Sequence, residues 1–295
     1  MAHKMRPFMG MIATGLIAGP AIAAVVAGSA VGAEALSVSQ LKEHTHIHGP
    51  AVDRQDSGKL LIATHHGLFR TGPDGKAELI SPVQDLMGFS PDPSDPKTLY
   101  ASGHPAGGGN LGFIASTDNG VTWDQISPGA NGPVDFHQMT VSSSNPQVLY
   151  GAYGALQVSR DAGKTWSIVG PLPEKLIDLA ASAKNADTIY AATEAGLSAS
   201  KDGGQSWETI VHGAPVSLVE VTADGFIYAF IVGRGLVRSA EADMDLAPIS
   251  SGLGDRILLH LAVDPADMGR IFVASHQGDI LASTDGGASW TEHGH

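Results

Sequence analysis

The chain contains the octapeptide Ser159-Arg-Asp-Ala-Gly-Lys-Thr-Trp166, and three further segments follow the same pattern, S-x-D-x-G-x-[ST]-W. They are Ser116-Thr-Asp-Asn-Gly-Val-Thr-Trp123, Ser200-Lys-Asp-Gly-Gly-Gln-Ser-Trp207 and Ser283-Thr-Asp-Gly-Gly-Ala-Ser-Trp290, so the octapeptide accounts for all 4 tryptophans. The pattern is typical of a tight hairpin, because Asp can accept hydrogen bonds from turn amides, Gly tolerates a positive φ and Trp can pack against the sheet. We therefore predict structural rather than catalytic roles for the Asp and Trp of each copy: Asp118, Trp123, Asp161, Trp166, Asp202, Trp207, Asp285 and Trp290.

The spacing of the octapeptides indicates six repeated units. Successive tryptophans are 43, 41 and 83 residues apart, and the last interval is close to two periods. A decayed copy, Ser239-Ala-Glu-Ala-Asp-Met-Asp-Leu246, fills this interval, and a hairpin without the full pattern, Phe69–Leu79, lies one period before Trp123. Each unit also has two short apolar runs ahead of its hairpin, which makes four strands per unit. A period in the low forties with four strands is typical of propeller blades.

The sequence therefore predicts an all-β fold, a six-bladed β-propeller that spans residues 36–295 as one domain. The composition agrees with this prediction, because 37 Gly and 17 Pro with only 16% charged residues favour many short strands and turns. The repeat does not fix how the ring closes. The segment Leu36–Glu43 is the candidate to complete the first unit.

The N-terminus has the pattern of an export signal. Met1–Gly10 carries Lys4 and Arg6, Met11–Val31 is apolar, and Ala33-Glu-Ala35 supplies the small-x-small pattern that signal peptidase accepts. We predict that residues 1–35 form a cleaved signal peptide and that the mature protein is periplasmic or secreted. The alternative is an uncleaved membrane anchor, because the apolar stretch is long for a signal peptide. After cleavage we expect no stable membrane insertion and a monomeric protein.

Charge and cysteine content narrow the classes of partner and cofactor. The 17 Lys and Arg against 30 Asp and Glu give a net charge of −13, and an acidic surface repels phosphate backbones. Nucleic acid is therefore not an expected partner. The absence of cysteine excludes disulfides, thiolate zinc sites, iron–sulfur clusters and cysteine nucleophiles. Any metal ion must bind through His, Met or carboxylate groups.

Histidines recur at two positions of the predicted blades. His48, Met87 and His137 align near the start of the strand that lines the axis, and His65 and His104 follow second strands. In a propeller these two positions face the same mouth of the central channel. Neutral imidazoles from several blades can converge on one ion, and Met87 would add a soft ligand that favours copper. The sequence thus predicts a copper or zinc site, with His48, His104 and His137 as first candidates and His65 and Met87 next.

The alternative interpretation is that these histidines never meet and that backbone groups satisfy each of them separately. Strand alternation sends neighbouring residues to opposite faces, so not every histidine can point into the channel. The glycine-rich segment Gly103–Gly112 follows the second strand of its unit. It is expected either to cover the channel mouth as a flap or to be a tolerated surface insertion.

The four octapeptides resemble the Asp-box, also called the bacterial neuraminidase repeat. Through Met87-Gly-Phe, Ser102-Gly-His-Pro105 and Val134-Asp-Phe-His137, the chain is also similar to exported glycosylhydrolase-like and sialidase-like proteins of the Asp-box group. This resemblance implies a propeller and raises the hypothesis of a glycoside hydrolase. A sialidase needs an arginine triad, and the predicted axial strands contain no Arg. For a two-carboxylate glycosidase the candidates are Asp135, Asp178, Glu220 and Asp255, with Asp135 the best placed.

The repeat is similar, too, to the photosystem II assembly factor group and to the sortilin propeller, both non-catalytic. We therefore favour a binding protein over an enzyme, with a metal ion, a glycan or an exported protein as its partner. The alternatives are a glycoside hydrolase of the sialidase-like Asp-box superfamily and a non-catalytic scaffold or assembly factor.

Overall fold

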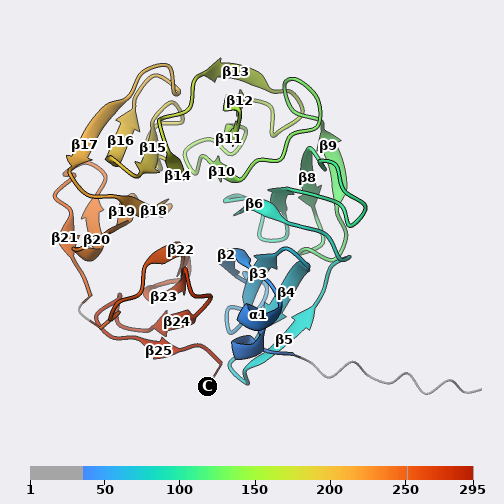
Figure 1. The fold of residues 1–295 in the computed structure, drawn as a ribbon, viewed down its shortest axis with the longest axis vertical. Coiled ribbons are helices and arrows are strands. Elements are labelled where there is room, and N and C mark those ends of the chain that lie inside the picture. The colour runs from blue at the N-terminus through green and yellow to red at the C-terminus, as the bar shows by residue number, and fades with distance from the viewer. Residues whose placement is uncertain (1–35, 251, 295) are drawn as a thin grey trace, which may run out of the picture. The chain divides into compact units, whose positions relative to one another are not determined.

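Six antiparallel sheets follow one another around a ring (Figure 1). The structure, a computed structural model, describes residues 36–250 and 252–294, so the predicted signal peptide lies outside the described residues. Each sheet is one blade, and its four main strands run in chain order from the axis to the rim. The prediction of a six-bladed, all-β propeller is confirmed.

The strand bounds show that each blade is built from one contiguous segment. Blade 1 contains β2 (Ile47–Val52), β3 (Leu60–Thr64), β4 (Gly67–Thr71) and β5 (Lys76–Leu79), and blade 2 contains β6 (Met87–Pro91), β7 (Leu99–Ser102), β8 (Phe113–Ser116) and β9 (Asp124–Ser127). Blade 3 contains β10 (Gln138–Val141), β11 (Leu149–Tyr153), β12 (Ala155–Ser159) and β13 (Ser167–Gly170), and blade 4 contains β14 (Leu176–Ala181), β15 (Ile189–Thr193), β16 (Gly196–Ser200) and β17 (Glu208–His212). Blade 5 contains β18 (Val216–Val221), β19 (Phe226–Ile231), β20 (Gly235–Ala240) and β21 (Ala247–Pro248), and blade 6 contains β22 (Leu258–Asp264), β23 (Asp267–Ser275), β24 (Ile280–Ser283) and β25 (Thr291–Glu292).

The N-terminal segment adds to a complete blade instead of supplying a missing strand. β1 (Leu36–Ser37) pairs with β5 as a fifth, outermost strand of blade 1. The helix α1 (Val38–His44) follows, with a capping box between Ser37 and Gln40 at its start. No helix among the described residues has the length and apolar character needed to cross a membrane.

Contacts between blades 1 and 6 close the ring. The axial strands β2 and β22 lie against each other. Val38 and Leu41 of α1 share a buried cluster with Phe272 and Ile280 of blade 6. The Lys42 ammonium donates a hydrogen bond to Asp279 at 2.7 Å. The helix therefore joins the first blade to the last.

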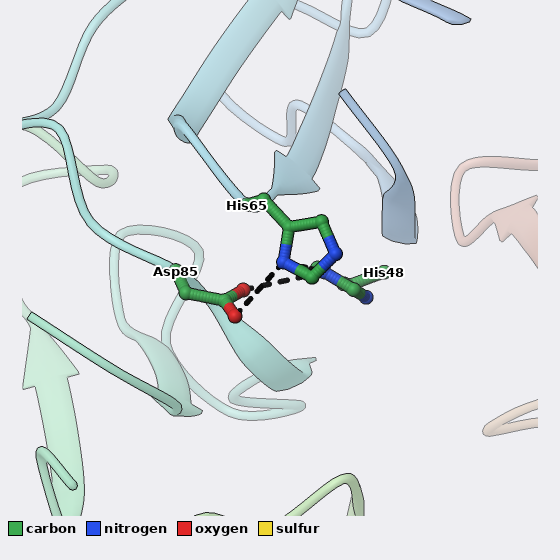
Figure 2. Close-up of side chains that lie close together, drawn as sticks. All are labelled: His48, His65 and Asp85. Carbon is green, nitrogen blue, oxygen red and sulfur yellow. Dashed lines mark hydrogen bonds and ion pairs between the residues drawn. The ribbon is translucent and has the colours of Figure 1, made fainter. Parts of the chain in front are cut away.

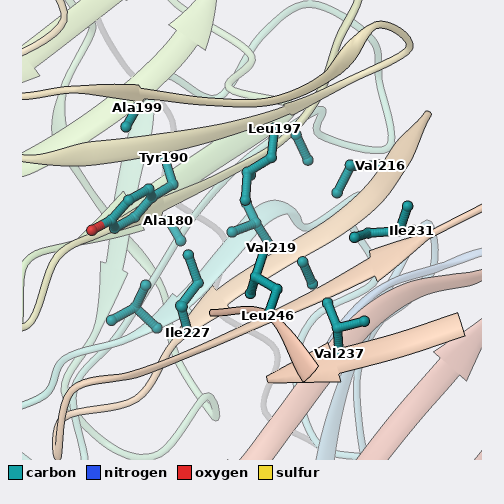
Figure 3. Packing of buried hydrophobic residues seen from close by; sticks show 13 residues of the cluster. Ala180, Tyr190, Leu197, Ala199, Val216, Val219, Ile227, Ile231, Val237 and Leu246 are labelled. Atoms are coloured by element: carbon teal, nitrogen blue, oxygen red, sulfur yellow. The ribbon is translucent and has the colours of Figure 1, made fainter. Parts of the chain in front are cut away.

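Apolar clusters fill the spaces between neighbouring blades. Figure 3 shows the cluster between blades 4 and 5, which includes Tyr190, Leu197, Val219 and Leu246. Leu246 stands where the decayed octapeptide lacks its Trp, and only 9% of it is exposed. A leucine thus takes over the packing role of the missing indole.

The four octapeptides share one hydrogen-bond pattern in the turns between third and fourth strands. In the copy of blade 3, the Ser159 hydroxyl donates to Asp161 at 2.8 Å and accepts from the Gly163 amide at 2.8 Å. Asp161 also accepts from the amide and the hydroxyl of Thr165, and the Trp166 indole N–H donates to the Gly163 carbonyl oxygen. The other copies repeat the Ser–Asp, Gly–Ser and Asp–Ser/Thr bonds. These carboxylates are engaged in holding turns.

Candidate metal site at the channel mouth

A channel of about 250 Å³ runs along the axis of the ring. Its lining includes His48, His137 and His260 near the starts of axial strands, and Arg54 and Met268 beyond the other end of these strands. The histidine end is called the channel mouth. The octapeptide turns lie at the opposite end, where the Asn119 side chain donates to Asp53 just after β2.

Three side chains from two blades converge at this mouth (Figure 2). His48 lies near the start of β2, His65 follows β3, and Asp85 precedes β6. The His48 Nε2 atom is 3.1 Å from His65 Nδ1 and 3.2 Å from Asp85 Oδ1, and His65 Nδ1 is 2.9 Å from Asp85 Oδ2. The side chains of His48 and Asp85 are each 13% exposed, and that of His65 is 42% exposed. The group is therefore set into the protein but open to solvent on the His65 side.

Local backbone features position the two histidines. The register between β2 and β3 shifts between Ile47 and Gly49, so His48 has no partner in the ladder. A bulge of this kind redirects the side chain that it carries. The turn that presents His65 is held by the Thr64 hydroxyl, which donates to the Gly67 carbonyl oxygen at 2.9 Å.

The electrostatics of the group favour an ionised Asp85. Burial disfavours its charge, but the adjacent imidazoles of His48 and His65 outweigh burial and lower the pKa of this carboxyl. His260 has a pKa lowered to about 4, because the surrounding protein desolvates its charged form and because His48 lies nearby. His260 is therefore neutral near pH 7.

A second group lies at the junction of blades 2 and 3. The Nε2 atoms of His104 and His137 lie 3.0 Å and 2.8 Å from the same oxygen, Oδ2 of Asp135. The Asp135 side chain is only 4% exposed. The other ring nitrogen of His104, Nδ1, is 2.7 Å from the carbonyl oxygen of Gly109. This hydrogen bond raises the pKa of His104 against the effect of burial, and the charges of Asp135 and Asp85 raise it further.

The structure thus distributes the predicted ligands over two groups. His48 and His65 meet at Asp85, and His104 and His137 meet at Asp135. Met87 begins β6 and pairs with Ser102, in the blade between the two histidine positions. The expectation of one site that combines His48, His104 and His137 is replaced by two separate clusters.

Asp85 is not among the ligands predicted from the sequence, and Asp135 is predicted only as a candidate glycosidase carboxylate. The signal was present as a repeated spacing: Asp85 precedes Met87 by two residues, just as Asp135 precedes His137 by two. Met87 and His137 occupy equivalent positions of their units. The carboxylates two residues ahead of them could have been included in the candidate site.

The other carboxylates predicted as glycosidase candidates lie outside these two histidine groups. Asp178 and Glu220 line the channel, where protein surrounds them although channel solvent reaches part of each side chain. Burial raises the pKa of Asp178 to about 7 although it accepts hydrogen bonds from the Leu179 and Val219 amides, each at 2.9 Å. Burial, followed by repulsion from Asp178, raises the pKa of Glu220 to about 8. Asp255 is exposed in the loop before β22.

Comparison with known proteins identifies the fold but no family. No family model matches this chain, and no curated protein matches it. Among solved structures, the GH74 enzyme of Niastella koreensis superposes with a TM-score of 0.59 at 18% identity, covering 84% of this chain and 45% of that one. The GH74 xyloglucanase of Xanthomonas campestris gives a TM-score of 0.58 at 18% identity with the same coverage of 84% and 45%. A structure of YCF48 bound to D1 peptide gives 0.52 at 18% identity and covers 84% of this chain and 82% of that one.

The chain therefore spans less than half the length of the GH74 enzymes that it matches, but most of YCF48. At these identities the likeness shows the propeller fold alone. Membership of the Asp-box family stays a prediction from the octapeptides.

Proposed function

We propose that this protein is an exported metal-binding propeller that holds a zinc or copper ion through His48, His65 and Asp85. The observation that carries the proposal is the convergence of ligand atoms from the three side chains, all within 4.8 Å of one another. The two histidine nitrogens are 3.1 Å apart, and each lies 2.9 to 3.2 Å from a different oxygen of Asp85. Zinc bonds of about 2.0–2.1 Å in tetrahedral geometry separate ligand atoms by roughly 3.3 Å. A small outward adjustment would accommodate the ion.

The chemistry of the donors fits these metals. Two imidazoles with one carboxylate suit zinc and Cu(II), and the chain has no cysteine that could provide a competing thiolate. Three protein ligands leave a fourth tetrahedral position for water or a partner group. Because His65 is on the exposed side of the group, a solvent ligand has access.

Hydrogen bonding without an ion does not satisfy the group. Suppose that His65 Nδ1 donates a hydrogen bond to Asp85. If His48 Nε2 carries a proton, that proton faces the N–H of His65. If His48 Nε2 carries a lone pair instead, the lone pair faces the acceptor oxygen Asp85 Oδ1, so neither state is well satisfied. Asp85 Oδ1 is buried and has no hydrogen bond of acceptable geometry, although His48 lies 3.2 Å away. A cation at the centre would satisfy all three atoms at once, which supports the proposal.

A binding role is better supported than glycoside hydrolysis. The carboxylates Asp178 and Glu220 line a channel of about 250 Å³, which is below the roughly 300–1,000 Å³ of ordinary ligand pockets. The match covers only 45% of the GH74 enzyme, so that enzyme is more than twice as long as the part that matches this chain. By contrast, the match covers 82% of YCF48, which was solved with a peptide. A peptide or protein partner at the mouth is the second candidate function, and it is compatible with a bound ion.

Calorimetric titration of residues 36–295 with Zn²⁺ and Cu²⁺ tests the proposal. We expect tight binding that weakens at least about 100-fold in His48→Ala and in His65→Ala, because each variant removes a direct ligand. The control is His66→Ala, which removes the exposed neighbour and should leave affinity unchanged. Absence of binding, or an unchanged number of bound ions in the His48→Ala/His65→Ala double variant, would refute the site.

A further inference from the structure

Asp135 is a buried carboxylate with an unusual set of partners. Two imidazole Nε2 atoms approach its Oδ2 oxygen, from His104 at 3.0 Å and from His137 at 2.8 Å. Its Oδ1 oxygen is buried and has no hydrogen-bond partner among the described residues. A buried oxygen without a partner is costly, so this arrangement needs an explanation.

We infer that His104, His137 and Asp135 form a second metal site, separate from the site at His48, His65 and Asp85. Its ligand set again consists of two imidazoles and one carboxylate, which suits zinc and Cu(II). The Asp135 oxygen lies between the two rings, and their nitrogens are farther apart than the 4.8 Å that spans the ligand atoms of the first group, so a ring must swing inward to share an ion. His137, with 63% of its side chain exposed, has the freedom to move onto an ion.

His104 already has the hydrogen bonding of a metal-binding histidine. Its Nδ1 atom is 2.7 Å from the Gly109 carbonyl oxygen, which can only accept, so Nδ1 carries a proton. Metal-bound histidines usually donate their other ring N–H to a backbone carbonyl or a carboxylate in this way. Nε2, which faces Asp135, is then the ring nitrogen that a cation could bind.

The blade repeat relates this group to the first one. His65 and His104 follow the second strands of blades 1 and 2, and Asp85 and Asp135 precede the axial strands of the next blades. In both aspartates, Oδ1 is buried without a hydrogen-bond partner. The same His–Asp pair therefore occurs twice, one blade apart.

The third donor distinguishes the two groups. The first pair is joined by His48 of blade 1, and the second pair by His137 at the start of blade 3. The equivalent position of blade 2, between the two pairs, holds Met87. The second imidazole of each group therefore comes from blade 1 or from blade 3, and neither comes from blade 2, which carries Met87. This arrangement supports two separate ions in preference to one shared ion.

The number of bound ions tests the inference. After equilibration with Zn²⁺ and desalting, elemental analysis of residues 36–295 should give two zinc ions per chain. His104→Ala/His137→Ala should retain one ion, His48→Ala/His65→Ala should also retain one, and the fourfold variant should retain none. The control is His276→Ala, because His276 is exposed after the second strand of blade 6, in the position equivalent to His104. It should keep two ions.

The outcomes separate this inference from the first site. One ion in the wild type, unaffected by His104→Ala/His137→Ala but lost with His48→Ala/His65→Ala, would overturn the second site and leave the first intact. One ion lost in either double variant would show a single shared site and would also overturn the inference. His137→Ala changes an exposed side chain, so a stoichiometry that falls to one in this variant, with an unchanged melting curve, supports direct ligation.

Discussion

The Nε2 atom of His48 lies 3.1 Å from the Nδ1 atom of His65, across the first two strands of blade 1. The contact depends on the bulge that removes His48 from the ladder while its neighbours Ile47 and Gly49 remain paired. Similar register shifts occur near the starts of β6, β14, β18 and β22. The blade repeat therefore supplies an irregular position at the mouth, and blade 1 has a histidine there.

Removal of metal should lower the stability of the protein. An ion that binds only the folded state adds about 2.7 kcal/mol to the free energy of unfolding when its free concentration is 100 times Kd. Thermal melts with Zn²⁺ and with excess chelator should therefore differ in midpoint. His48→Ala/His65→Ala should show a smaller difference, and the loss of any difference in the wild type would contradict the prediction.

The channel carboxylates should make stability fall as pH rises. Glu220 has a pKa of about 8 in the folded state against an ordinary value of 4.5. Between these values the folded state binds more protons than the unfolded state, so stability decreases with increasing pH. Asp178, with a pKa of about 7, acts in the same direction.

Glu220→Gln should remove part of this dependence. We expect little change in the free energy of unfolding at pH 5, and a gain of about 1–3 kcal/mol at pH 9. The gain is below the full 1.36 kcal/mol per pKa unit because channel water screens the charge. Urea titrations at both pH values measure it, with Glu208→Gln, at an exposed residue that begins β17, as the control. Equal effects at pH 5 and pH 9 would argue against a raised pKa.

Leu246 should be important for the packing of blade 5. Truncation to Ala leaves a cavity beside Val219 and Leu197, and buried Leu→Ala changes typically cost about 2–5 kcal/mol. Because 9% of Leu246 is exposed, we expect a value near the lower end. Leu79→Ala, at a residue that is 40% exposed, should cost less than about 1 kcal/mol. Denaturant unfolding of the two variants compares them.

The octapeptides should contribute to stability and not to metal binding. Ser159→Ala removes the hydroxyl that accepts from the buried Gly163 amide. A buried amide left without a partner costs about 1–3 kcal/mol. We expect this loss in urea unfolding, with zinc affinity unchanged in calorimetry. A weaker affinity for zinc in the folded variant would show that the turn and the mouth are coupled.

The ring could be predicted from sequence because its information is local and repeated. The period of the tryptophans predicts the blades, and Leu246 at the decayed position keeps the count at six. The outer strand β1 could not be predicted in this way, because Leu36–Ser37 is too short to show a pattern. Its pairing depends on the neighbouring β5 and on α1, which follows it.

The sequence places the histidines at one mouth of the channel, but it does not predict which side chains contact one another there. Alignment of the units placed His48 and His65 at one mouth, since both positions recur in every blade. Asp85 and Asp135 lie in connections just before axial strands, where neither period 2 nor the octapeptide spacing determines where a side chain points. The separation of His104 from His48 likewise depends on three-dimensional contacts with those aspartates.

The contact between α1 and blade 6 also affects how the molecule folds and unfolds. In an open stack of repeats, the end units can fray independently of the rest. Here the residues before the first blade pack on Phe272 and Ile280 of the last, so neither end is a free edge. The final closure must wait until blade 6 is available. Loss of that blade would uncover both β2 and the apolar side of α1, and we expect unfolding to be a concerted loss of the whole ring.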